Sequence, residues 1–268
     1  MPSTPRPLIN NAFDGHMHSK LCGHAVGEME EYVVAAIDKG LSGINFLEHL
    51  EIDIRYFEKT WLSDAEFSYY VSEGKRLKNK YKSQIQVGTG IEVGFNPNRV
   101  PEIKTFLDTY DWDLIGISYH FLDTAEKYHL NMVSSKKQNL DAALKYGPEK
   151  IVLAYYEGLR QAASILPGTV LCHLDAVLRF LPEIPLTNEI WDRIMDVLDV
   201  IKNRGMALEV NTSGYRIRDE PFPAIRLLRE AVRREIPLSL GSDAHKPGDV
   251  GRYFHRLPEL AEQLRDDG

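Results

Sequence analysis

The chain has 268 residues, 43% hydrophobic and 26% charged, which excludes a disordered protein, and its two cysteines are too few for a disulfide scaffold. The 32 basic and 39 acidic residues give a net charge of −7, so no nucleic-acid partner is expected. No apolar run approaches the roughly 20 residues of a membrane span, and Met1–Asn10 lacks the apolar core of a signal peptide. We expect a single cytoplasmic domain over residues 1–268, without membrane contact.

Strand-like and helix-like segments alternate along the chain. Short apolar runs predict seven strands, at Leu8–Phe13, Gly43–Leu47, Ile85–Ile91, Leu114–Ser118, Thr169–Cys172, Met206–Val210 and Pro237–Leu240. Amphipathic spacing predicts helices over Glu28–Lys39, Pro148–Leu166, Thr187–Arg204 and Pro223–Arg234. Ser63 and Glu66 have the spacing of a capping box that opens a further helix. Repeated βα units favour an α/β fold, a distorted (β/α)7 barrel in one domain.

Polar side chains follow all seven predicted strands. In a parallel barrel the carboxyl ends of the strands meet at one rim, where active sites are built. We therefore expect these residues to converge: Asp14, His16, His18, Glu48, His49, Glu92, His120, His173, Asn211, Asp243 and His245.

Several of these positions have the chemistry of metal ligands. His16 and His18 are two residues apart in a strand, so both imidazoles can face one ion, although two ordinary surface or core histidines are the alternative. Glu92 follows an apolar run, where a carboxylate is costly unless it is paired with an arginine or bound to metal. His24 lies in the first loop, and alone it is typical of a loop or capping histidine.

Together, seven histidines and two carboxylates exceed one tetrahedral site. They suit two or three ions with one bridging carboxylate, an arrangement that serves phosphoryl hydrolysis. His129 and His255 fall outside this pattern, and we expect both on the surface.

The local motifs resemble those of the PHP family, named for polymerases and histidinol phosphatases. The resemblance covers nearly the whole chain and rests on Asp14-Gly-His16-Met-His18-Ser19, Cys22-Gly-His24-Ala25, Glu48-His49, Gly90-Ile-Glu92, Tyr119-His120-Phe121, Cys172-His173-Leu174-Asp175 and Gly241-Ser-Asp243-Ala-His245. The Cys22 and Tyr119 motifs, with Asn211-Thr-Ser-Gly214, look like the histidinol-phosphatase branch. The branch often has an acidic residue soon after the third-strand glutamate, where this chain has Val93-Gly94-Phe95-Asn96.

The resemblance implies three divalent ions, of Zn, Mn or Fe, in a TIM-like barrel. By analogy one ion takes His16, His18, Glu92 and Asp243; a second takes Glu92, His120 and His173; a third takes His24, His49 and His245.

The resemblance further implies that metal-activated water hydrolyses L-histidinol phosphate in histidine biosynthesis. Arg160 and Arg216 are the candidate phosphate contacts, and Asp14 and Glu48 are candidates either for the proton donor or for orienting ligand histidines. An acidic rim would attract the cationic amino-imidazole, and the candidates are Glu51, Asp53, Asp123 and Asp175.

Other functions stay open at this point. A PHP phosphoesterase could act on another small phosphomonoester or on a nucleic-acid end. An amidohydrolase also uses a His-x-His barrel, and a non-catalytic metal-binding module would need the same ligands. The stretch Asp53–Tyr81 could form a lid on the site or simply cover the barrel.

Overall fold

A seven-stranded parallel sheet forms the centre of the computed structural model, which describes residues 8–181 and 184–265. The strands follow one another around the sheet in the order β1-β2-β3-β4-β7-β8-β9. They are β1 (Phe13–Met17), β2 (Gly43–Glu51), β3 (Gln86–Gly94), β4 (Ile115–Ser118), β7 (Val170–Leu171), β8 (Ala207–Asn211) and β9 (Leu238–Gly241). Two short strands, β5 (Phe121–Leu122) and β6 (Leu130–Asn131), pair antiparallel beside this sheet.

The first and last strands meet just beyond their carboxyl ends. The amide of His18 donates to the carbonyl of Ala244 at 2.9 Å, and the amide of Asp243 donates to the carbonyl of His16 at 2.8 Å. Met17 and Ala244 form an isolated parallel bridge. These bonds bring the sheet close to a closed cylinder, so the predicted distorted (β/α)7 barrel is confirmed.

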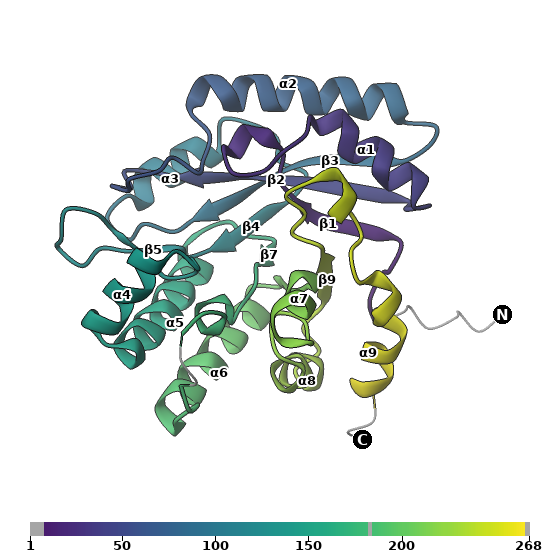
Figure 1. The fold of residues 1–268 in the computed structure, drawn as a ribbon. Helices are drawn as coiled ribbons and strands as arrows, with labels where there is room; N and C mark the ends of the chain where they lie inside the picture. The colour runs from purple at the N-terminus through teal and green to yellow at the C-terminus, as the bar shows by residue number, and fades with distance from the viewer. Residues whose placement is uncertain (1–7, 182–183, 266–268) are drawn as a thin grey trace.

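Helices surround the sheet (Figure 1). In the view of that figure, α1 and α2 cover the outer side of β1–β3, and α5, α6 and α8 lie on the other side of the barrel. The helices are α1 (Met29–Asp38), α2 (Asp64–Tyr81), α3 (Val100–Leu107), α4 (Lys137–Tyr146), α5 (Pro148–Ile165), α6 (Asn188–Asn203), α7 (Tyr215–Arg218), α8 (Ile225–Arg233) and α9 (Leu257–Gln263). Four of them, α3, α4, α7 and α9, were not predicted from the sequence.

Helix α2 shows how local sequence and packing agree. The amide of Ser63 donates to Glu66 at 2.7 Å, and the Ser63 hydroxyl accepts from the Glu66 amide at 3.4 Å, which completes the predicted capping box. Gly74 then faces Thr89 of β3, and a Cβ at Gly74 would lie 2.1 Å from the Thr89 hydroxyl oxygen. Glycine is therefore needed where this helix crosses the sheet.

Three strands extend further toward the rim than the sequence predicted. The expected strand Leu8–Phe13 is wrong, since β1 begins at Phe13, and β2 and β3 continue to Glu51 and Gly94. The apolar pattern is interrupted because polar side chains such as His16, His49 and Glu92 lie near the carboxyl ends of these strands. His16 and Glu92 therefore lie within strands rather than after them.

None of the helices among residues 8–181 and 184–265 is both long and apolar enough to cross a lipid bilayer. Of the stretch Met1–Asn10, residues 1–7 lie outside the described residues.

Candidate metal centre

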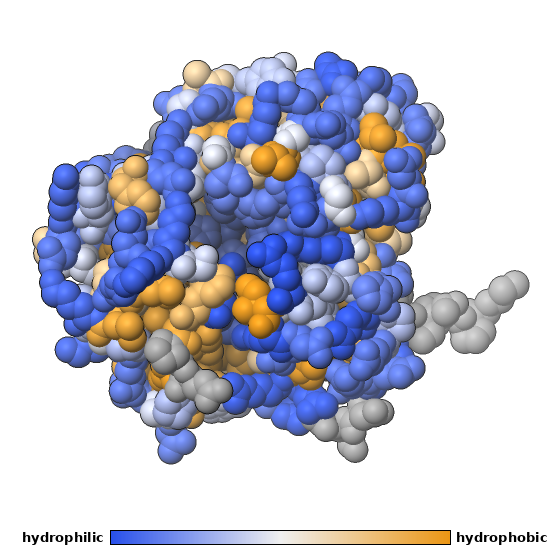
Figure 2. Space-filling view, viewed as in Figure 1, coloured by the Kyte–Doolittle hydropathy of each residue, from blue (hydrophilic) through white to orange (hydrophobic). Residues whose placement is uncertain are grey.

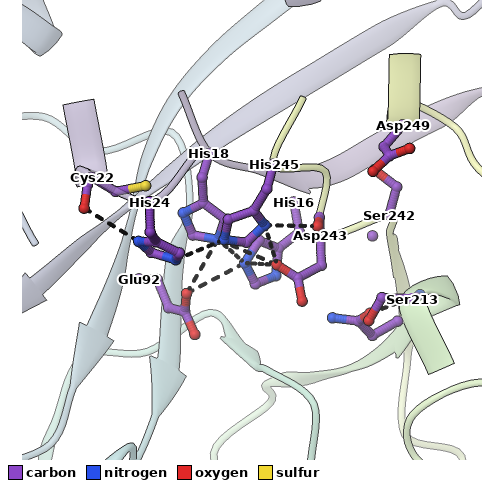
Figure 3. A network of polar contacts seen from close by, with 12 residues as sticks. His16, His18, Cys22, His24, Glu92, Ser213, Ser242, Asp243, His245 and Asp249 are labelled. Atoms are coloured by element: carbon purple, nitrogen blue, oxygen red, sulfur yellow. Dashed lines mark hydrogen bonds and ion pairs between the residues drawn. The ribbon is translucent and has the colours of Figure 1, made fainter. Parts of the chain in front are cut away.

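All nine ligand positions predicted from the sequence lie at the carboxyl end of the barrel. His16 belongs to β1, His49 to β2 and Glu92 to β3, while His24 lies in the loop that follows the 3-10 turn Lys20–Cys22. The others come within four residues after a strand end, and they are His18, His120, His173, Asp243 and His245. Figure 3 shows six of the nine pointing toward one another from strands that are distant in the sequence.

Glu92 occupies the centre of this group. Its Oε2 lies 3.4 Å from His16 Nε2, 3.5 Å from His18 Nε2 and 3.0 Å from His49 Nδ1. This oxygen is buried, yet its geometry allows no hydrogen bond from any of the described residues. Three nitrogens close to an oxygen that accepts from none of them are typical of ligands arranged around an ion.

The other oxygen of Glu92 faces a second pair of imidazoles. Oε1 lies 2.8 Å from His173 Nε2 and 3.2 Å from His120 Nε2. The two oxygens of one carboxylate therefore serve two separate sets of imidazoles, which is the geometry a bridging ligand needs.

On the Oε2 side, the Nε2 atoms of His16 and His18 are only 2.9 Å apart. Asp243 Oδ1 lies 3.5 Å from His18 Nε2 and 3.9 Å from His16 Nε2. Two ring nitrogens at this separation repel unless a proton or a metal ion lies between them. A carboxylate beside them suits a cation.

A second close nitrogen pair lies at the outer edge of the centre. The Nε2 atoms of His24 and His245 are 2.9 Å apart. The rings of His18 and His49 stack at 4.1 Å between centroids. Atoms of His18, His49 and His245 lie within 4.8 Å of one another, and so do those of Cys22, His24 and His245.

Burial and neighbouring rings keep key groups in the state that binds metal. Burial lowers the pKa of His24 to about 3, assisted by His49 and His245, so this imidazole is neutral. Burial opposes ionisation of Glu92, but the surrounding imidazoles, His49 and His120 foremost, outweigh it and hold the pKa of the carboxyl well below its usual range. Neutral imidazole and ionised carboxylate are the forms that coordinate divalent ions.

Four of the rings are oriented through the nitrogen that faces away from the centre. His24 Nδ1 lies 3.2 Å from the Cys22 carbonyl, and His245 Nδ1 lies 3.0 Å from the Asp243 carbonyl. The other two rings contact buried carboxylates instead: His16 contacts Glu209, which the sequence analysis missed, and His120 contacts Glu51.

Asp14 and Glu48 bind backbone and hydroxyl groups rather than ligand rings. Asp14 accepts from the amides of Ser242 and Gly251, both at 2.8 Å, and so joins β1 to the segment after β9. Glu48 accepts from the amide and hydroxyl of Ser19, at 2.8 and 2.5 Å. Burial raises the pKa of Glu48 to about 7.

A cavity of about 340 Å³ opens onto the centre. Figure 2 shows a hydrophilic hollow near the middle of the face viewed there. The cavity is lined by seven predicted ligands, namely His24, His49, Glu92, His120, His173, Asp243 and His245.

The two arginines predicted to clamp phosphate do not line this cavity. Arg160 lies in a separate hollow on α5, where it pairs with Glu157 at 2.8 Å, and Arg216 is exposed on the short helix α7. The cavity's basic residues are instead Arg179 and Lys136, which the sequence analysis did not single out. Arg216 was predicted to contact phosphate because it follows the end of a strand, but its side chain is exposed and does not line the cavity.

Of the four acidic candidates for the cationic end of a substrate, only Glu51 lines the cavity, and Glu58 joins it. Each of the other three is held by an arginine: Asp123 by Arg55 at 3.1 Å, Asp175 by Arg218 at 2.7 Å and Asp53 by Arg99 at 2.7 Å.

The stretch Asp53–Tyr81 divides between the two roles expected for it. Tyr56, Glu58 and Thr60 line the cavity, whereas the later part forms α2 on the outside of the barrel.

One of the two remaining histidines differs from expectation. His129 is buried rather than on the surface, because its Nδ1 accepts from the Arg55 amide at 3.2 Å and so ties the β5–β6 hairpin to the loop after β2. His255 is exposed, as predicted.

Comparison with known proteins gives consistent matches. The family model of the PHP domain matches residues 14–213. The "Probable histidinol-phosphatase" of Deinococcus radiodurans is 32% identical, with 95% of this chain and 93% of the relative covered. The histidinol-phosphatase of Bacillus subtilis is 31% identical, with 92% and 98% covered.

A solved structure has the same fold. It is the histidinol phosphate phosphatase of Lactococcus lactis in complex with zinc, L-histidinol and phosphate. The TM-score is 0.79 at 21% identity, with 94% of this chain and 93% of that chain covered.

Proposed function

The chain belongs to the PHP domain family, and we propose that it is a histidinol-phosphatase, which hydrolyses L-histidinol phosphate to L-histidinol and phosphate in histidine biosynthesis. The observation that carries this proposal is the position of Glu92, whose two oxygens face two sets of imidazoles at the floor of an open cavity. The cytoplasmic location and the single domain over residues 1–268 stay predictions.

We assign three divalent ions to this centre. The first would be held by His16, His18, Glu92 and Asp243, the second by Glu92, His120 and His173, and the third by His24, His49 and His245. The distances to Glu92 support the first two sets, and the 2.9 Å approach of His24 to His245 supports the third. Zinc is the first candidate, because imidazole suits it and the Lactococcus lactis protein contains it, and Mn or Fe would accept the same donors.

When bound, such ions neutralise a phosphate dianion and supply hydroxide near neutral pH. The chain's own side chains do the rest. Four of the ligand imidazoles are held in direction through their outward nitrogens, so little rearrangement is needed when substrate arrives. The barrel floor is buried, which strengthens each charge interaction with the phosphate.

Arg179 is the group that we assign to the phosphate oxygens. It lines the cavity together with His120 and His173. Its Nε is buried and has no hydrogen-bond partner among the described residues, and its guanidinium stacks 4.8 Å from the centre of the Phe222 ring. A guanidinium that packs on a ring and lines the cavity beside a cation centre is suited to an anionic ligand that both can share.

The outer part of the cavity suits the amino-imidazole end of the substrate. Glu58 lies here in an ion pair with Lys136, and the rings of Tyr56 and Phe121 pack with their centroids 4.9 Å apart. A cationic heterocycle can pack on these aromatic rings.

The experiment that tests the proposal compares two substrates on one zinc-loaded preparation. We expect kcat/KM for L-histidinol phosphate to exceed that for para-nitrophenyl phosphate by at least about 100-fold, or roughly 2.7 kcal/mol of differential transition-state binding. A ratio near one, or a preference for a nucleotide end or an anionic sugar phosphate, would reject this substrate and leave a PHP phosphoesterase of another specificity.

A further inference from the structure

Two buried carboxylates outside the ligand set contact imidazoles of the metal centre. They are Glu209 in β8 and Glu51 at the end of β2. We propose that both are positioning residues, which orient His16 and His120 so that each presents Nε2 to one of the two ions sharing Glu92. The inference rests on the metal centre of the proposed function.

Glu209 binds groups from three different strands or strand ends. Its Oε1 accepts from His16 Nδ1 at 2.6 Å, and its Oε2 accepts from the backbone amide of His173 at 2.8 Å and from Asn211 Nδ2 at 3.2 Å. Gly241 leaves room for it, since a Cβ at that glycine would lie 2.4 Å from Glu209 Oε1. Two donors thus fix Oε2, and Oε1 accepts from the imidazole.

Glu51 contacts His120 in the way that Glu209 contacts His16. Its Oε1 accepts from His120 Nδ1 at 2.8 Å, and its side chain is 2% exposed. Gly94 provides the space, because a Cβ there would lie 2.0 Å from Glu51 Oε1. A larger residue at Gly94 would therefore displace the carboxylate from its imidazole.

These contacts determine which ring nitrogen is free to bind metal. A carboxylate accepts only, so Nδ1 of each ring must carry the proton, and the lone pair is left on Nε2. His16 Nε2 lies 3.4 Å from Glu92 Oε2, and His120 Nε2 lies 3.2 Å from Glu92 Oε1. One oriented imidazole thus serves each oxygen of the bridging carboxylate.

The carboxylates also make these two imidazoles stronger donors than their neighbours. His24 and His245 point Nδ1 at backbone carbonyls, which carry no net charge. An anionic partner raises the basicity of a ligand imidazole, and loss of such a partner typically weakens metal binding 10- to 100-fold.

Glutamine is an informative replacement at Glu209. The carboxylate accepts from His16 on one oxygen and from the His173 amide on the other, whereas an amide has only one acceptor oxygen. In Glu209→Gln the side-chain NH2 group must therefore face one of these two donors, from which it cannot accept a hydrogen bond. Glu51→Gln keeps its single acceptor and loses only the charge, so its effect is smaller.

The test measures zinc release from the loaded protein to a chromogenic chelator. We expect Glu209→Gln to release at least one zinc ion about 10- to 100-fold faster than the parent, and Glu51→Gln about tenfold faster or less. Glu48→Gln is the matched control, because Glu48 is equally buried in β2 but accepts from Ser19 rather than from a ring. Its release rate should stay within about twofold of the parent.

A second measurement needs no variant. In the zinc-loaded parent, nitrogen-15 NMR of the histidine rings should show His16 and His120 protonated at Nδ1. A proton on Nε2 of either ring, or release rates in Glu209→Gln equal to those of the control, overturns the inference. A parent chain that binds no zinc overturns the metal centre itself, so the two failures are distinguishable.

Discussion

Replacement of Arg179 tests how the cavity recognises phosphate. The Arg179 Nε is buried without a partner among the described residues, and the guanidinium is held on the Phe222 ring. Truncating one member of a buried, hydrogen-bonded charge pair costs about 2–5 kcal/mol. At 1.36 kcal/mol per decade, Arg179→Ala should lower kcat/KM for L-histidinol phosphate between ~30-fold and ~5000-fold.

Arg179→Lys separates charge from geometry. Lysine keeps the charge but loses the planar fork, and one charge-assisted hydrogen bond contributes about 1.5–3 kcal/mol, so a loss between ~10-fold and ~150-fold is expected. The assay is steady-state phosphate release with zinc content measured on the same sample, which should not change because Arg179 is not a ligand.

Arg160→Ala and Arg216→Ala serve as controls, since neither side chain lines the cavity. Each should keep kcat/KM within about twofold of the parent. If Arg179→Ala turns over normally, or if either control loses activity to the same extent, the assignment of phosphate binding to Arg179 is wrong.

Three further predictions follow from the site and the fold. Glu92→Gln should lose at least one metal ion per chain in elemental analysis, because an uncharged amide bridges two cations poorly; full retention would contradict the bridging role. Ser63→Ala should lower the free energy of unfolding at pH 7 by about 1 kcal/mol. The hydrogen bond from Ser63 is the largest cause that lowers the pKa of Glu66 to about 2. The loss of stability in Ser63→Ala should therefore narrow as the pH falls from about 4.5 toward 2 in urea titrations. A loss that is the same at every pH would show that the contact does not depend on the charge of Glu66. Gly74→Ala should lower the free energy of unfolding by about 1–3 kcal/mol in the same titrations, because its Cβ would lie 2.1 Å from the Thr89 hydroxyl oxygen. An unchanged urea midpoint would show that α2 can shift away from β3 without loss of stability.

The barrel could be predicted because its signals are local and periodic. The capping box at Ser63 and Glu66 and the bounds of the long helices depend on neighbours a few residues away. The start of β1 could not be predicted in this way. Its inward side chains are polar ligands such as His16, so hydrophobicity marks the wrong segment.

The candidate ligands could be identified from the sequence, but the groups that support them could not. Eight of the nine candidate ligands lie in or shortly after the carboxyl-terminal part of a strand, a position that can be inferred from the strand pattern. Glu209 contacts His16 across 193 positions of sequence, and nothing local distinguishes it from any other strand glutamate. Arg179 follows a short 3-10 turn, and its direction into the cavity depends on packing against Phe222.

The central claim is that hydrolysis of L-histidinol phosphate requires ions held at the barrel rim. The most direct measurement follows phosphate release by the purified chain as isolated, after removal of metal by a chelator, and after zinc is added back. The account predicts that release falls by at least about 100-fold on chelation and recovers with zinc. Undiminished release from metal-free protein, or none from protein shown to hold zinc, would contradict it.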